Sequence, residues 1–198
     1  MTGAVILKRK LRKKRQEAAQ LAKLNRKLGS ESKKYEKMAM RDELTGALNR
    51  NGVNGVLENS IRTYFDNEQP FSILLLDIDH FKVINDDYGH AEGDRILKEL
   101  VDVISRRKRN SDFIARWGGE EFLVVCDNTT TDQAYMFAEV LRKQIAAHAF
   151  LSERPVTCSI GVAEMFGADI ELAFQSADEA LYKAKAGGRN RTEAYRPA

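Results

Sequence analysis

Two acidic residues follow an apolar run near the middle of the chain, a pattern that suits a cation site. The run Phe71–Leu76 is followed by Asp77 and Asp79, with Lys82 and Asn85 a few residues beyond. Magnesium prefers one or two carboxylates together with phosphate oxygens, so an acidic strand end can provide its protein ligands. The alternative is that Asp77 only starts a turn.

A second acidic segment follows a pair of glycines. Gly118 and Gly119 join two short apolar runs, which is typical of a β-hairpin, and Glu120 and Glu121 come directly after them. We expect three or four carboxylates to converge if the second hairpin strand lies beside the strand that ends at Asp77. Such a cluster is unfavourable unless a metal ion neutralises it. The two segments together predict a metal-dependent site that handles phosphates.

The order of the predicted elements places both segments on one sheet. Apolar spacing predicts helices over 49–65, 91–107, 131–148 and 170–186, and strands over 71–78, 113–117, 121–126 and 156–163. From the first strand onward the order is βαββαβ, the split βαβ arrangement. We therefore predict an α+β fold with a ferredoxin-like or palm-type antiparallel sheet and helices on one face, in which the second hairpin strand neighbours the first strand.

The first 40 residues differ from the rest in charge. They hold 13 of the 32 Lys and Arg residues but only three of the 29 Asp and Glu residues, so the remainder is acidic although the net charge is +3. A heptad pattern places Leu7, Leu21, Leu24, Leu28, Tyr35 and Met38 at core positions, and it is weakened by Lys14, Glu17 and Gly29. We predict a basic coiled-coil helix over 1–40 and one domain over 41–198. The alternative for the first segment is a solvated basic helix.

Composition and local patterns exclude several classes of protein. With 43% hydrophobic residues and three prolines the chain is not globally disordered, and its apolar run Ile73–Leu76 is far shorter than a membrane span. The apolar start 1–7 before the basic run 8–15 resembles the cytoplasmic edge of a membrane helix, so we expect a cytoplasmic protein, or the cytoplasmic part of an inner-membrane protein joined to the membrane only through a missing N-terminal segment. No aromatic residues interleave with the basic run, and no nucleic-acid partner is expected. Cys126 and Cys158 lack metal or disulfide spacing and are predicted to be reduced core thiols.

Four segments, in order, resemble the motifs of the GGDEF family of diguanylate cyclases. WGGEEF at 117–122 is similar to the signature in its GGEEF form, and DIDHFKVINDDYGHAEGD at 77–94 is similar to the first-strand motif. DELTGALNR at 42–50 resembles DxLTGLxNR, with Ala47 in place of leucine, and LYKAKAGGRN at 181–190 resembles the C-terminal motif. The resemblance covers about residues 41–195. It implies an enzyme that joins two GTP molecules into cyclic di-GMP and releases pyrophosphate.

The resemblance also implies a metal site and a catalytic role for the acidic residues. Asp77, Glu120 and the Ile78 carbonyl would bind Mg²⁺ or Mn²⁺. Glu121 would either assist a second metal ion or take the proton of the attacking 3′-hydroxyl.

Substrate contacts are implied in the same way. Asn85 and Asp94 would recognise guanine by hydrogen bonds. The other residues implied at the substrate are the phosphate ligands Lys82, Lys185 and Arg189, the glycines Gly118 and Gly119 that let the backbone approach the nucleotide, and His80 and Phe81.

Regulation and assembly follow from the same resemblance. Arg109 and Asp112 form an RxxD sequence, with five residues between Asp112 and Gly118, that resembles the family's inhibitory site for cyclic di-GMP. An alternative is that these are ordinary exposed charges at a helix end. Because each domain would hold one GTP, the reaction requires a homodimer, which the predicted coiled coil would support.

Three other functions compete with the cyclase. A catalytically silent relative would bind cyclic di-GMP or GTP as a receptor, a related enzyme would act on a different nucleotide, and a structural coiled coil would carry a passenger domain. Silent relatives usually lose signature carboxylates or the glycine pair, whereas this chain retains Asp77, Gly118, Gly119, Glu120 and Glu121. The sequence therefore favours the enzyme.

Overall fold

The structure is a computed structural model that describes residues 14, 20, 21, 23–25, 27, 39–167 and 169–196. The chain divides into two units, Met1–Ala39 and Met40–Ala198. In the first unit the described residues are helical, and Leu21 and Leu24, two of the predicted heptad core positions, have exposed side chains. The remaining heptad positions lie outside the described residues, so the coiled coil stays a prediction: Leu7, Glu17, Leu28, Tyr35 and Met38.

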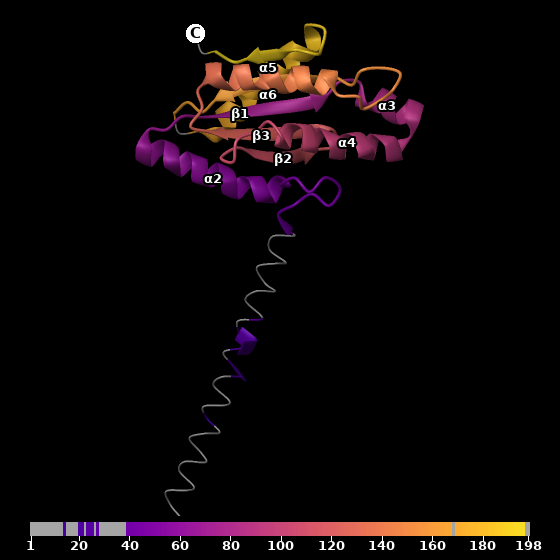
Figure 1. The fold of residues 1–198 in the computed structure, drawn as a ribbon. Coiled ribbons are helices and arrows are strands. Elements are labelled where there is room, and N and C mark those ends of the chain that lie inside the picture. The colour runs from indigo at the N-terminus through magenta and orange to yellow at the C-terminus, as the bar shows by residue number, and fades with distance from the viewer. Residues whose placement is uncertain are drawn as a thin grey trace, which may run out of the picture. The chain divides into compact units, whose positions relative to one another are not determined.

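The described part of the second unit is built around a five-stranded sheet with the order β2-β3-β1-β4-β5 (Figure 1). The strands are β1 (Phe71–Ile78), β2 (Phe113–Gly118), β3 (Glu121–Asp127), β4 (Cys158–Glu164) and β5 (Thr192–Ala194). Neighbours from β2 to β4 are antiparallel, as predicted, whereas β5 runs parallel to β4. The sheet is therefore mixed, and the prediction missed β5 because three residues are too few to show a period.

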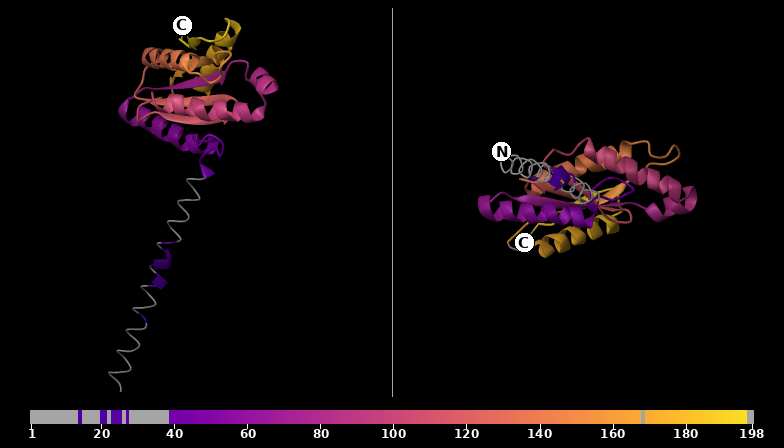
Figure 2. Two further views of the ribbon diagram at one scale, coloured as in Figure 1. Left: turned by 45° about the vertical axis from the view of Figure 1, so that its right-hand side comes forward. Right: turned by 90° about the horizontal axis from the view of Figure 1, so that it is seen from below.

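Helices cover both faces of the sheet (Figures 1 and 2). Apolar residues of α4 (His90–Ser105) and α5 (Thr131–Ala147) pack on one face, and those of α2 (Arg50–Asn67) and α6 (Ile170–Ala186) pack on the other. The two helices of the βαββαβ unit, α4 and α5, lie on one face as predicted, whereas α2 and α6, for which no face was predicted, form a layer on the other. The central strand β1 is buried at every position, so its two apolar faces need two layers of helices.

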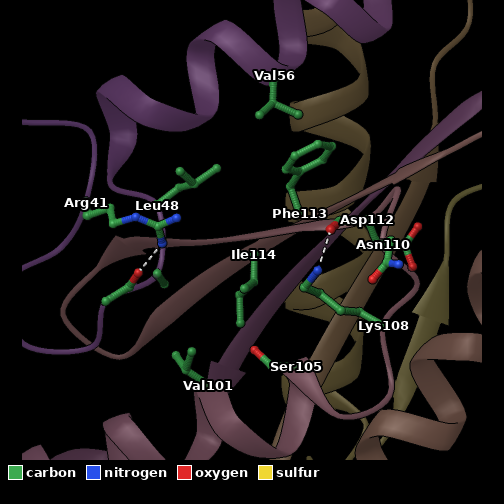
Figure 3. A pocket seen from close by; sticks show the side chains of 12 residues that line it. Arg41, Leu48, Val56, Val101, Ser105, Lys108, Asn110, Asp112, Phe113 and Ile114 are labelled. Carbon is green, nitrogen blue, oxygen red and sulfur yellow. Dashed lines mark hydrogen bonds between the residues drawn. The ribbon is translucent and has the colours of Figure 1, made fainter. Parts of the chain in front are cut away.

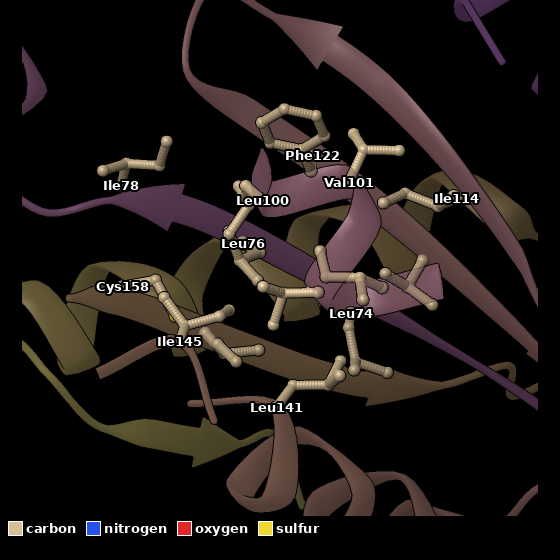
Figure 4. Packing of buried hydrophobic residues seen from close by; sticks show 14 of the residues in the cluster. Leu74, Leu76, Ile78, Leu100, Val101, Ile114, Phe122, Leu141, Ile145 and Cys158 are labelled. Atoms are coloured by element: carbon tan, nitrogen blue, oxygen red, sulfur yellow. The ribbon is translucent and has the colours of Figure 1, made fainter. Parts of the chain in front are cut away.

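The core on the α4–α5 side joins side chains from the sheet and both helices. Leu74 of β1 packs in one cluster with Leu100 of α4 and Leu141 of α5 (Figure 4). Cys126 and Cys158 are free and buried in this cluster, which confirms the prediction of reduced core thiols. Burial raises the pKa of both thiols, so it suppresses the reactive thiolate form.

A short helix, α3 (Phe81–Tyr88), lies between β1 and α4 and was not predicted as a separate element. It follows His80, whose backbone is left-handed with φ of 58°, and it ends at Gly89, with φ of 85°. Phe81 and Ile84 point into the core. Their spacing with Tyr88 is helical, and together with the glycine it would have indicated the helix.

Candidate active site

The two acidic segments lie side by side at one end of the sheet. β1 and β3 are antiparallel neighbours with Asp77 opposite Glu121, and the Ile78 amide donates to the Glu120 carbonyl at 3.4 Å. Asp77 is buried, Glu120 is half-buried and Glu121 is exposed. The strand register thus brings together the carboxylates that the sequence predicted to meet.

Asp77 is an incompletely neutralised carboxylate. Burial raises its pKa, the nearby charges of Glu120 and Glu121 raise it further, and Lys185 offsets part of this effect. The Lys185 Nζ lies 2.8 Å from the Asp77 Oδ2. A raised pKa means that the surroundings disfavour the ionised form, and additional positive charge at this position would favour it.

The oxygen donors at this end of the sheet suit a hard divalent cation. Asp77, Glu120 and the backbone at Ile78 are donors of the kind that Mg²⁺ and Mn²⁺ take, and Mg²⁺ needs only one or two carboxylates when phosphates complete its shell. Across the described ranges no three His, Cys, Asp or Glu side chains come close enough to hold a metal ion by themselves. The expected convergence of three or four carboxylates is therefore looser than predicted.

Asp79 differs from Asp77 because its carboxylate is held by three hydrogen bonds from the protein. It is 4% exposed, and its carboxylate accepts hydrogen bonds from Thr157 Oγ1 at 2.7 Å, Ser159 Oγ at 2.7 Å and the Asn190 amide at 2.9 Å. These donors come from the chain around the start of β4 and from the turn after α6. Asp79 therefore ties three segments together and is not available as a metal ligand.

The turn after α6 carries basic residues to the same end of the sheet. Left-handed backbone at Gly188, Arg189 and Asn190 reverses the chain, and the Asn190 amide bonds to Asp79. The Arg189 side chain is exposed and has no ion pair within the described part of the chain. Lys82, in the first turn of α3, is also exposed. Of the three predicted phosphate ligands, Lys185 alone contacts a carboxylate among the described residues.

Two arginines hold the Gly118–Gly119 turn. Arg50 donates to the Trp117 carbonyl and lies over the Trp117 ring, 5.0 Å from its centroid, and Arg116 Nε donates to the Gly119 carbonyl at 2.9 Å. Neither glycine has a positive φ, and a Cβ at Gly119 would meet no described atom within 4 Å. Glycine at position 119 is therefore required neither by its backbone conformation nor by packing against the described residues.

Arg116 also links this turn to the DELTG segment. Its Nη1 lies 3.3 Å from the Asp42 Oδ1, and Asp42 accepts hydrogen bonds from the Thr45 amide at 2.9 Å and the Thr45 hydroxyl at 2.7 Å. Burial alone would raise the pKa of Asp42, but these hydrogen bonds and the charge of Arg116 outweigh it and lower the pKa. Asp42 is thus an anchor for the arginine that holds the glycine turn.

The predicted guanine-binding residues lie on two adjacent helices. Asn85 is half-buried on α3, and Asp94 is exposed near the start of α4. His80 is exposed, whereas Phe81 is 7% exposed and its ring packs in the core. The structure therefore leaves the polar side chains at the surface and gives Phe81 a packing role.

The predicted inhibitory residues lie at the other end of β2 from the glycine turn. At about 3.3 Å per residue, the strand separates the two by roughly 17 Å. Asp112 is buried and accepts a hydrogen bond from the Arg109 amide at 2.7 Å, which closes the turn. The Arg109 side chain is exposed, without a side-chain partner in the described part of the protein.

A cavity of about 380 Å³ lies beside this turn (Figure 3). Val56, Val101 and Ile114 line it from α2, α4 and β2. Its two basic side chains already bond to backbone carbonyls, Lys108 to Asp112 at 2.8 Å and Arg41 to Gly46 at 2.6 Å. The cavity is thus a hollow next to the turn that is lined by both apolar and polar side chains.

Four residues organise the site through contacts that the sequence did not predict: Asp42, Arg50, Asp79 and Arg116. Asp79 was expected among the carboxylates that converge on a cation. The sequence did indicate that Asp79 has hydrogen-bond partners, because a carboxylate directly after a fully buried strand is itself buried and needs them. The two arginines and Asp42 act through contacts between distant segments, which local patterns do not reveal.

This end of the sheet thus joins an acidic strand end, a glycine turn and a basic helix terminus, which are the features that the sequence predicted for a metal-dependent site. The chain belongs to the family described as "Diguanylate cyclase, GGDEF domain", whose model matches residues 39–191.

Characterised relatives and solved structures agree with this assignment. The chain is similar to diguanylate cyclase DgcP of Pseudomonas aeruginosa, with 42% identity over 159 residues that cover 78% of this chain and 24% of that protein. It is similar to diguanylate cyclase DgcM of Escherichia coli K12, with 40% identity over 157 residues that cover 79% of this chain and 38% of that protein. The chain thus spans well under half the length of these relatives.

The fold is similar to the crystal structure of the coiled coil and GGDEF domain of DgcB from Caulobacter crescentus in complex with c-di-GMP. The TM-score is 0.81 at 29% identity, and the match covers 89% of this chain and 96% of that one. This likeness confirms the predicted palm-type fold. None of the helices in the described residues has the length and apolar character needed to span a membrane.

Proposed function

We propose that this chain is a diguanylate cyclase that joins two GTP molecules into cyclic di-GMP and releases two pyrophosphates. The observation that carries the proposal is the incompletely neutralised Asp77, which lies opposite Glu121, beside the glycine turn and in contact with Lys185. Its GTP substrate places the domain in the cytoplasm. Names of the relatives support the activity, and the retained signature residues argue against a silent receptor.

Asp77, Glu120 and the Ile78 carbonyl are the proposed ligands of Mg²⁺ or Mn²⁺. When bound, the ion would neutralise the triphosphate and stabilise the leaving oxygen. Lys185 contacts Asp77 when no ligand is bound. Once a metal ion binds the Asp77 carboxylate, the Lys185 ammonium group can pair with a phosphate oxygen instead. Lys82 and Arg189 complete the phosphate contacts from the start of α3 and the turn after α6.

The chemistry requires each 3′-hydroxyl to attack the α-phosphorus of the other GTP. A bond forms between the 3′-oxygen and phosphorus, the bond to pyrophosphate breaks, and the hydroxyl proton passes to a base. We assign that base to Glu121, because its carboxylate is exposed and lies across from Asp77. Asp94 accepts from the N1 and N2 donors of guanine, and the Asn85 amide bonds to the remaining polar atoms of the base.

Two domains must meet, since each holds one GTP. We infer that residues 1–40 form the coiled coil of a homodimer, supported by the heptad pattern and by the coiled coil that the DgcB structure contains. Linking the domains in this way raises their effective concentration. Analytical ultracentrifugation should show a dimer at tens of micromolar protein with GTP bound, and a monomer under those conditions would contradict the proposal.

Product inhibition through the RxxD turn is the proposed control. Arg109 offers an exposed guanidinium to a phosphate, and Asp112 closes the turn that presents it. Binding of c-di-GMP in the DgcB structure supports a product site in this fold. Substitution Arg109→Ala should raise the cyclic di-GMP concentration for half inhibition by about tenfold, the size of one charge-assisted contact.

The decisive experiment measures GTP turnover with Mg²⁺ by chromatography while the product is removed. The wild type should form cyclic di-GMP, and Asp77→Ala and Glu120→Ala should form none. Tight binding of cyclic di-GMP without turnover at high protein concentration would instead show a receptor.

A further inference from the structure

Gly93 lies in the first turn of α4, directly before Asp94, and is buried against α3. A Cβ built on Gly93 would lie 2.0 Å from the Asn85 Oδ1, and 3.1 Å from both the Asn85 Cγ and the Phe81 Cζ. The first distance is far below any normal non-bonded contact. The Asn85 amide therefore occupies the space that a side chain at position 93 would fill.

The helix gains nothing from glycine at this position. Alanine is the better helix former, and the Gly93 backbone is not in the left-handed region. Gly55, an exposed glycine in α2, provides the comparison, because a Cβ there would meet no described atom within 4 Å. Glycine at 93 thus has a steric use that glycine at 55 lacks.

A methyl group at position 93 would displace the side-chain amide of Asn85, because this amide moves more readily than the backbone of α3 or α4. The backbone carbonyl of Asn85 accepts a hydrogen bond of 2.9 Å from the Gly89 amide, which caps the end of α3. Its side-chain amide has no hydrogen bond to other described residues, so it can rotate to another rotamer at low cost. Phe81 would have to shift by only a few tenths of an ångström. The expected consequence is a folded protein with a displaced amide.

We propose that Gly93 is a positioning residue for guanine recognition: the absence of a side chain at position 93 leaves the space against α4 that the Asn85 amide occupies. This inference rests on the proposed function, since it takes GTP as the ligand. A base is recognised by matched donors and acceptors, so moving one of the two recognising groups weakens binding of the base.

The test compares Gly93→Ala with the matched control Gly55→Ala. Turnover and calorimetric binding are measured with GTP and with ITP, which lacks the 2-amino group of guanine. Gly93→Ala should keep the circular dichroism spectrum and cooperative unfolding of the wild type. Its KM should rise about tenfold for GTP and for ITP, because both bases carry the atoms assigned to Asn85, and kcat should change less than threefold. Gly55→Ala should leave the kinetic and binding values unchanged.

A double-mutant cycle shows whether Gly93 acts through Asn85. In the Asn85→Ala background no amide remains to be displaced, so adding Gly93→Ala should have no further effect on KM. An additional tenfold loss in that background would overturn the proposal, as would a wild-type KM in Gly93→Ala alone.

The failure of the inference and that of the proposed function are distinguishable. If the wild type binds GTP without turnover, the cyclase proposal fails and the cycle is evaluated in dissociation constants. If the wild type binds neither GTP nor ITP, both proposals are rejected.

Discussion

The two halves of the proposed nucleotide site are stabilised by different means. We call them the phosphate half (Asp77, Asp79, Glu120 and Lys185) and the base half (Asn85, Gly93 and Asp94). In the phosphate half the two aspartates are buried, and their partners come from segments about 80 to 110 residues away. In the base half the polar side chains lie at or near the surface, and their placement depends on packing between two helices that are joined at Gly89.

This difference reflects the physical cost of burying charge compared with shaping a surface. A buried carboxylate needs donors or cations from several directions, which only distant parts of the chain can supply. A surface amide needs only a local wall that fixes its rotamer, and neighbouring helices provide one. Changes in the phosphate half should therefore affect catalysis and stability, whereas changes in the base half should affect nucleotide choice in an intact fold.

The largest effect is expected for Asp77→Asn. Loss of the charge at the proposed metal site should reduce turnover by about a thousandfold or more. The folded-state pKa of Asp77 is raised, so its stability contribution is complete at low pH and is lost as pH rises through that pKa. A neutral asparagine avoids this loss, and the thermal midpoint at pH 7 should equal or exceed that of the wild type.

Product chromatography and differential scanning calorimetry measure the two quantities in parallel. The control is Asp102→Asn, which removes an exposed carboxylate on α4 and should leave turnover unchanged. Turnover within tenfold of the wild type in Asp77→Asn would remove Asp77 from the metal site.

Asp79→Asn should instead reduce stability. The amide replaces an acceptor of three hydrogen bonds by a group that places N–H donors against other donors in a buried site. Breaking such a network should lower the free energy of unfolding by about 3 kcal/mol. Urea denaturation measures this loss, and Ser159→Ala, which removes one donor, should cost about 1 kcal/mol. A loss below that of Ser159→Ala would show that Asp79 is not the anchor of the three segments.

The base half should respond through specificity. Asp94→Asn removes the acceptor for the two guanine donors, so kcat/KM for GTP should fall about a hundredfold and the preference over ITP should narrow, with unfolding unchanged. Asp86→Asn, at an exposed position of α3, is the matched control and should behave as the wild type. An equal fall for GTP and ITP would mean that Asp94 does not contact the 2-amino group.

Apolar spacing in the sequence predicted the bounds of the helices and strands better than it predicted how the helices are layered on the sheet. Strand β1 and helix α6 have the bounds expected from apolar spacing, and the pairing of β1 with β3 follows from the order of elements. The second layer of helices was missed, although β1 is apolar on both faces and therefore indicated it. β5 depends on pairing with β4 in three dimensions, so its own three residues contain no signal.

The candidate site shows the same division. The base half lies within the continuous segment 77–94 and was identified as a motif, together with Asp77 and Glu120. The sequence did not reveal that Asp79 is satisfied by Ser159 and Asn190, or that Gly93 makes room for Asn85. Such contacts depend on side-chain positions after folding, which residue types and spacing do not specify.

The smallest effect is expected at Asp42, which supports the phosphate half from outside through Arg116. Asp42→Asn should lower the free energy of unfolding at pH 7 by about 1 kcal/mol, the value of a typical hydrogen bond in a partly exposed network. Because the folded-state pKa is lowered, the wild-type advantage is complete above the ordinary aspartate pKa of about 3.9 and is lost as pH falls through the folded-state value. Chemical denaturation at pH 7, 5 and 3.5 should therefore show equal differences in the free energy of unfolding at the first two pH values and a smaller difference at the third.

The control is Asp66→Asn, at an exposed position near the end of α2, which should show no difference from the wild type at pH 7. If Asp42→Asn and Asp66→Asn have the same effect, the contact between Asp42 and Arg116 contributes nothing to stability, and Asp42 does not support the phosphate half.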